Sequence, residues 1–152
     1  MRLDSFLIAD NATVADGKLY VHGGGITRIN ALSLPLAMSL TVAVRLLVEE
    51  DEIGTTKRLT LAVTDPDGSS MLPPAPIDLP IERPGPDMLP DEEMLLQMTV
   101  GMALQFTRGG TYHFKLTIDE EVLRDLRLPV ATLTQEQLKR FTGQVPPRSV
   151  GQ

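Results

Sequence analysis

The sequence predicts an all-β protein: a two-sheet antiparallel sandwich, Ig-like or jelly-roll-like, with one short C-terminal helix. Three observations predict it. Apolar and polar residues alternate in several segments, turn residues recur at intervals of roughly 8 to 12 residues, and alternating βα units are absent. A small barrel is the alternative, whereas a doubly wound fold with its ligand site at a switch point is not expected.

The strongest alternation runs through residues 38–48, where every second side chain is apolar. Residues 59–63 and 111–118 repeat the pattern, and Asp65-Pro66-Asp67-Gly68 supplies turn chemistry after the first of these. Because these strands share one phase, we expect one core between the two sheets. Its predicted members are Leu40, Val42, Val44, Leu46, Leu61, Val100, Leu104, Phe114, Leu116 and Ile118.

Residues 94–106 fit both a strand and a helix, because Met94, Met98 and Met102 recur at helical spacing within an alternating pattern. A helical stripe would place Gln105 on its apolar side, so we favour a strand. A methionine-lined binding groove is the functional alternative, although methionine more often fills core gaps. With short connections on either side of residues 111–118, we expect residues 96–106, 111–118 and 122–130 to form a meander.

Shorter elements are expected at both ends of the chain. Residues 3–9, 18–22 and 26–30 predict strands, with Asp16-Gly17 as a turn. Within the proline-rich stretch of residues 70–91, only residues 77–82 could pair, as an edge strand.

Near the C-terminus, Thr134 and Gln137 fit a capping box, and Gly143 ends a short helix that carries Leu138 and Phe141. We therefore expect a sandwich domain over residues 1–131, and a short helix with a flexible tail over residues 132–152.

Charge and composition disfavour several function classes. The formal net charge is -6 and the basic residues are scattered, so nucleic-acid binding is not expected. No apolar stretch approaches the roughly 20 residues of a membrane span, and the first ten residues lack a signal-peptide pattern. Cysteine is absent, which removes thiol chemistry and cysteine-bound zinc. We expect a cytoplasmic protein without membrane contact.

The string His22-Gly23-Gly24-Gly25 matches the oxyanion loop of many lipases and esterases. The sequence contains no Gly-x-Ser-x-Gly elbow, and His113 is its only other histidine. We therefore interpret the glycines as a backbone device, with at least one residue of positive φ. We assign no catalytic, cofactor-binding or metal-binding residue.

Acidic residues gather where strands are predicted to end. Calcium prefers six to eight oxygen ligands, so a calcium site is one interpretation and a solvated acidic loop is the other. The cluster that begins at Glu49 and the pair of Asp65 and Asp67 bracket residues 59–63, so they should lie at opposite ends of the sandwich. The clusters are Glu49 to Glu52, Asp65 with Asp67, Asp91 to Glu93, and Asp119 to Glu121.

Several strings resemble a family of uncharacterised bacterial domains of unknown function. The first motif contains Leu7-Ile8-Ala9-Asp10, Asp16-Gly17-Lys18-Leu19-Tyr20-Val21-His22-Gly23-Gly24-Gly25 and Arg28-Ile29. Pro35, the Asp65 turn, Arg83-Pro84 and Gly110-Thr111-Tyr112 extend the resemblance over most of the first 130 residues. It implies a compact bacterial cytoplasmic domain and carries over no catalytic residue. The segment after Thr132 departs from the pattern.

The function we expect is a non-catalytic protein-interaction or self-assembly module, which acts through sheet faces or edges as a homo-oligomer or with a protein partner. Ala43 and Leu47 interrupt the polar face of residues 38–48, so we expect such a contact to include Leu47 or the helix with Leu138 and Phe141. A small-ligand or calcium-binding module is the alternative. An enzyme ranks third, because no nucleophile is paired with a base, and we expect no cofactor.

Overall fold

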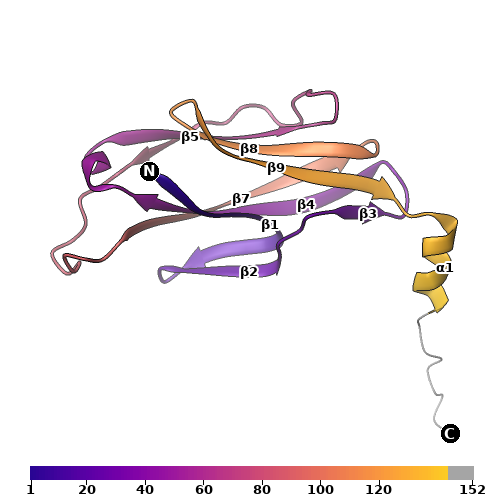
Figure 1. Cartoon of the computed structure of the whole chain (residues 1–152), viewed down its shortest axis with the longest axis horizontal. Helices are drawn as coiled ribbons and strands as arrows, with labels where there is room; N and C mark the ends of the chain where they lie inside the picture. The colour runs from indigo at the N-terminus through magenta and orange to yellow at the C-terminus, as the bar shows by residue number, and fades with distance from the viewer. Residues whose placement is uncertain (144–152) are drawn as a thin grey trace, which may run out of the picture.

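Two sheets packed face to face form the protein in the computed structural model, which describes residues 1–143 (Figure 1). The predicted all-β sandwich with one short C-terminal helix is confirmed. One sheet has the order β2-β1-β4-β7, and the other has the order β3-β9-β8-β5-β6. The elements are β1 (Arg2–Ala15), β2 (Lys18–Gly24), β3 (Ile29–Ala31), β4 (Leu36–Val48), η1 (Glu50–Glu52), β5 (Thr56–Thr64), β6 (Ile77–Pro80), β7 (Met94–Phe106), β8 (Gly110–Ile118), β9 (Glu121–Thr132) and α1 (Gln135–Gly143).

The core lies between the two sheets and is mostly aliphatic. All ten predicted core side chains face it or its edge, but Leu61 and Val100 are only half-buried. The rings of Phe106 and Tyr112 form an edge-to-face contact within the core, with their centroids 4.9 Å apart. The Tyr112 hydroxyl donates a hydrogen bond to the Arg108 carbonyl. This aromatic pair joins the two sheets where the chain crosses between them.

The predicted meander is wrong at its first turn. β8 and β9 form a hairpin, but β7 pairs with β4 in the opposite sheet. Residues 107–109 carry the chain across the sandwich, and Arg108 is held beside the end of β5 by ion pairs with Asp65 and Asp67. A side chain at Gly110 would overlap Pro66, so this crossing requires glycine at that position.

The β1–β2 hairpin forms a partial third layer. β1 pairs with β4 up to Ala9 and continues into a ladder with β2, which lies below the sandwich in Figure 1. Near the tip of the hairpin, Gln97 of β7 donates to the Gly17 carbonyl at 2.7 Å. Thr41 and Ala43, which the alternation placed on an outward face, are buried. The placement of Ala43 on an outward face is therefore wrong.

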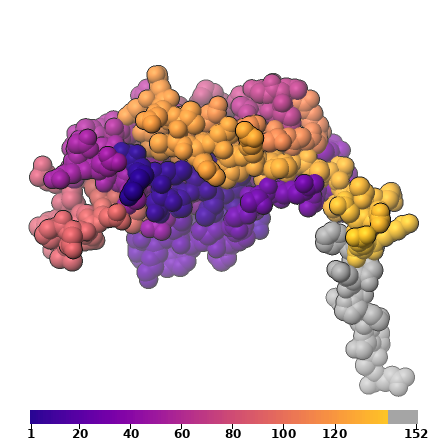
Figure 2. All heavy atoms as spheres, viewed as in Figure 1, coloured from indigo at the N-terminus to yellow at the C-terminus, as the bar shows by residue number. Residues whose placement is uncertain are grey.

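The ends of the chain follow the predictions with shifted bounds. Residues 26–30 were expected to form a strand, and β3 instead covers Ile29–Ala31 and pairs in parallel with β9. β6 is an edge strand, as expected. The capping box of α1 is confirmed, because Gln137 N–H donates to Thr134 Oγ1 and Thr134 N–H donates to Gln137 Oε1. α1 projects from one end of the sandwich (Figure 2).

Two other points concern the C-terminal region and the helices. The side chain of Phe141 and the expected tail lie outside the described residues. In residues 1–143, neither helical segment has the length and apolar character that crossing a membrane would require.

Two-residue turns close both hairpins. Asp16 and Gly17 join β1 to β2, and Asp119 and Glu120 join β8 to β9, and all four have positive φ. Two successive positive φ angles define a type I′ turn, which matches the twist of the flanking strands and favours glycine. The second turn carries no glycine, so Glu120 at φ 72° is strained relative to Gly17 at φ 69°.

We predict that Glu120→Gly raises the free energy of unfolding by about 1 kcal/mol, because glycine adopts this φ without a steric penalty. Urea denaturation gives the value. Glu121→Gly is the matched control, since Glu121 begins β9 without a positive φ, and it should lower the stability by about 0.5 to 1 kcal/mol. Equal destabilisation by both changes would contradict the assignment of strain to Glu120.

Candidate interaction site

β7 is the longest of the strands that end a sheet in residues 1–143. It spans 13 residues, against seven in β2, four in β6 and three in β3. One side of β7 pairs with β4 along the whole length, from Val48 opposite Met94 to Leu36 opposite Phe106. Its other side pairs with no strand in the described part of the chain.

The composition of β7 leaves this edge available for pairing. Natural sheets protect their edges with short strands, prolines or charged side chains, lysine above all. β6 is short and ends at Pro80, β3 is short, and β2 begins with Lys18. β7 contains no proline and no charged residue in its 13 positions. It is the edge in residues 1–143 that lacks all of these protections.

The inward side chains of β7 are incompletely covered. Leu96, Met98 and Met102 pack against the core but are only half-buried, as is Val100. Because β7 is the last strand of its sheet, no neighbouring strand covers their outer side. Leu95, on the opposite face, is 37% exposed. The inward face of the edge is therefore apolar, whereas the opposite face carries Leu95 beside the uncharged polar residues Gln97, Thr99 and Gln105. The predicted burial of Val100 is incomplete in one chain.

The methionines of this segment lie on a strand, as the alternation predicted. Met98 and Met102 contribute to the core cluster, while Met94 lines a pocket at the start of β7. The three side chains therefore do not form one continuous methionine-lined groove.

That pocket, of about 560 Å³, brings two of the acidic clusters together. β4 and β7 are antiparallel, so the residues that follow Val48 meet the residues that precede Met94. Glu49 and Glu50 lie on one side and Glu92 and Glu93 on the other. The apolar lining comes from Leu47, Val48, Ile53, Met88, Leu89 and Met94. Leu47, which the sequence suggested for a contact surface, thus faces this pocket.

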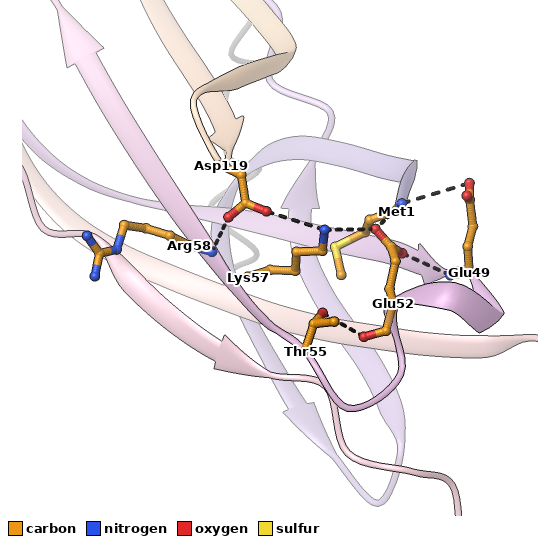
Figure 3. Close-up of polar contacts among 7 residues, drawn as sticks. All are labelled: Met1, Glu49, Glu52, Thr55, Lys57, Arg58 and Asp119. Atoms are coloured by element: carbon orange, nitrogen blue, oxygen red, sulfur yellow. Dashed lines mark hydrogen bonds and ion pairs between the residues drawn. The ribbon is translucent and has the colours of Figure 1, made fainter.

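Glu52, in the same acidic cluster, is buried and bridges separate parts of the chain (Figure 3). Its Oε1 accepts a hydrogen bond from the Met1 ammonium at 2.5 Å and lies 3.4 Å from Lys57 Nζ. The Glu49 amide donates to Oε2 at 3.0 Å. Lys57 Nζ also lies 3.3 Å from Asp119 Oδ2, so the β8–β9 turn joins the same network.

Opposing effects act on the pKa of Glu52. Burial raises the pKa, but hydrogen bonds from the Met1 ammonium and the Glu49 amide outweigh it, with attraction to the ammonium and a hydrogen bond from Lys57 adding to them. The net pKa of Glu52 lies below its ordinary value of 4.5. The carboxylate is therefore ionised at neutral pH and serves as a structural anchor for this end of the sandwich.

The two histidines lie on different sheets. His22 is exposed in β2 opposite Asn11, whereas His113 in β8 is 2.9 Å from Asp125 in β9. Gly23 and Gly25 have φ values of 60° and 77°, which confirms the predicted backbone role. A side chain at Gly23 would also overlap the Asp10 carboxylate. The glycines thus turn the chain at the end of β2 and allow its close approach to β1.

The Asp65 pair lies at the other end of the sandwich from the Glu49 cluster. Asp65 and Asp67 contact Arg108 beyond the Phe106 end of β7, far from Glu49 at the Met94 end. The predicted placement of these two clusters at opposite ends is confirmed. Within residues 1–143, no group of three or more histidine, aspartate or glutamate side chains is arranged to hold a metal ion.

The edge and the pocket were not recognised from the sequence. The absence of charge and proline from residues 94–106 was the available signal for the edge, but it also fits an interior strand. The convergence of Glu49 with Glu93 depends on strand order, which alternation does not encode.

We predict that Glu52→Gln lowers the free energy of unfolding at pH 7 by about 1 to 3 kcal/mol, because a buried network loses its charged acceptor. The folded pKa of Glu52 lies below the unfolded value, so its contribution is present above pH 4.5 and disappears as the pH falls through the folded pKa. Urea denaturation across this range should show the difference between wild type and variant shrinking at acidic pH.

Glu50→Gln is the matched control, because Glu50 is exposed and makes no ion pair or hydrogen bond through its side chain in the described structure. It should leave the stability nearly unchanged. A difference between wild type and Glu52→Gln that stays constant with pH would contradict the role given to the carboxylate.

Comparison with known proteins is consistent with the motif resemblance. No curated protein matches the sequence. The chain matches the family of unknown function DUF6941 over residues 4–131, which covers all nine strands except the ends of β1 and β9. The protein therefore belongs to the family of unknown function DUF6941.

Proposed function

We propose that the protein is a non-catalytic self-assembly module, in which β7 pairs with β7 of a second copy. The observation that supports this most is the long, uncharged, proline-free edge of β7 with its half-buried inward side chains. Antiparallel pairing would extend the four-stranded sheet of each copy across a two-fold axis. The resemblance of the N-terminal motif to bacterial domains leads us to place this role in the bacterial cytoplasm.

Pairing would satisfy the backbone and the side chains together. Alternate N–H and C=O groups along an edge strand point away from its neighbour and need water or another strand as partner. A second β7 would supply these groups. It would also cover the outer side of Leu96, Met98, Val100 and Met102, and each square ångström of apolar surface removed from water contributes about 25 cal/mol.

A second copy suits this edge for electrostatic reasons. Around a two-fold axis, identical residues approach one another, so a charged residue near the centre of β7 would repel its own copy. The 13 residues of β7 carry no charge, although the whole chain has a formal net charge of -6. The charge that would oppose association of two copies lies elsewhere on the chain.

The proposal is tested by light scattering coupled to size exclusion at increasing protein concentration. We expect wild type to approach twice the mass of one chain at tens of micromolar. Gly101→Lys should remain monomeric, because lysine on an edge strand opposes pairing. A side chain at Gly101 meets only Thr41 Oγ1, at 4.0 Å, and Gly101 has no positive φ, so the monomer should accommodate it.

Thr132→Lys is the matched control, since it adds the same charge at an exposed position on the other sheet and should still dimerise. A strictly monomeric wild type over the whole concentration range would contradict the proposal. So would a Gly101→Lys variant that dimerises as strongly as wild type.

A further inference from the structure

We propose that the pocket at the Met94 end of β7 binds a small organic amine, a molecule with an apolar body and one ammonium group. This site lies beyond one end of the pairing edge and shares only Met94 with β7, and its binding of a ligand does not depend on self-assembly. Its volume of about 560 Å³ falls within the range of roughly 300 to 1,000 Å³ that small-molecule sites occupy.

The floor of the pocket can hold an apolar body. Leu47, Val48, Ile53 and Met94 are half-buried there, and Leu89 at the side is 66% exposed. A large apolar side chain in solvent gains from any ligand that covers it. An aliphatic chain or a small ring would contact these side chains and remove their apolar surface from water.

The charge around the pocket selects the sign of the ligand. Four glutamates and one arginine line it, so carboxylates outnumber cations. Arg2 Nη2 lies 3.8 Å from Glu93 Oε1, and the Met1 ammonium lies 3.8 Å from Glu49 Oε1, both longer than a hydrogen bond. Glu50 makes no ion pair in the described structure. Glu92 Oε2 accepts a hydrogen bond from the Leu89 amide at 3.1 Å. Glu50 is therefore the carboxylate of the four without a partner among residues 1–143, and the excess of carboxylates over cations favours a cation at the rim and disfavours an anion.

The geometry gives the amine one orientation. Glu50 and Glu93 are exposed, whereas Val48 and Met94, which pair across the two strands, are half-buried beneath them. The apolar body therefore lies on the floor, and its ammonium group points to the carboxylates at the rim, as lysine side chains do at protein surfaces.

The test is an NMR titration of the full-length chain with hexylamine, hexanol and hexanoate, which share one apolar body and differ in charge. We expect hexylamine to bind at least about threefold more tightly than hexanol, from exposed ion pairs that each contribute modestly. Hexanoate should bind most weakly. Methyl signals of Ile53, Met88 and Leu89 should report the binding, and added salt should weaken only the amine.

Two variants separate charge recognition from non-specific binding. Glu50→Gln/Glu93→Gln should reduce hexylamine affinity about threefold or more and leave hexanol unchanged. Glu121→Gln/Glu136→Gln makes the same change in net charge outside the pocket and should leave both unchanged. Equal binding of the three probes, shifts confined to other residues, or binding of calcium without binding of hexylamine would each overturn the assignment. Light scattering on the same samples keeps this result distinct from the β7 proposal.

Discussion

The pairing of β4 with β7 is the interaction on which the rest of the structure depends. β4 lies inside its sheet between β1 and β7, and its central residues from Leu40 to Val44 are buried on both faces. One side meets the core and the other lies under the β1–β2 hairpin. Because β7 follows β4 in unbroken register for 13 residues, its alternation is fixed by that of β4. β7 is the last strand of the sheet. Its register with β4 brings together the acidic segment that follows Val48 and the acidic segment that precedes Met94.

The free edge and the acidic pocket are therefore two consequences of one topology. The chain crosses to the other sheet after Phe106, so β8 does not form a hairpin with β7 and pairs with β9 instead. β7 is left with an unpaired side. At its opposite end, the segment before Met94 returns beside Glu49, which places four glutamates around an apolar floor. The edge of β7 and the floor of the pocket both leave apolar surface exposed, and we propose a partner for each.

Much of the fold was predictable because a strand with one buried face has a period of two. Leu40, Val44, Phe114 and Leu116 were placed in the core on that pattern and are buried there. Strand order was not predictable, since alternation specifies a face and not a neighbour. That gap explains the wrong meander, the covered Ala43 and the half-buried Val100. The clustering of Glu49 with Glu93 escaped prediction for the same reason, whereas the glycines after His22 were read correctly from local backbone chemistry.

Amide hydrogen exchange along β7 tests the central claim most directly. In a single chain, the amides that face β4 are hydrogen-bonded, while the alternate amides face the free edge. At concentrations where two copies pair, we predict that the edge-facing amides near Val100 also exchange slowly, and that dilution or Gly101→Lys restores fast exchange to these amides alone. Fast exchange of the edge-facing amides at every concentration, with slow exchange of the others, would contradict pairing through β7.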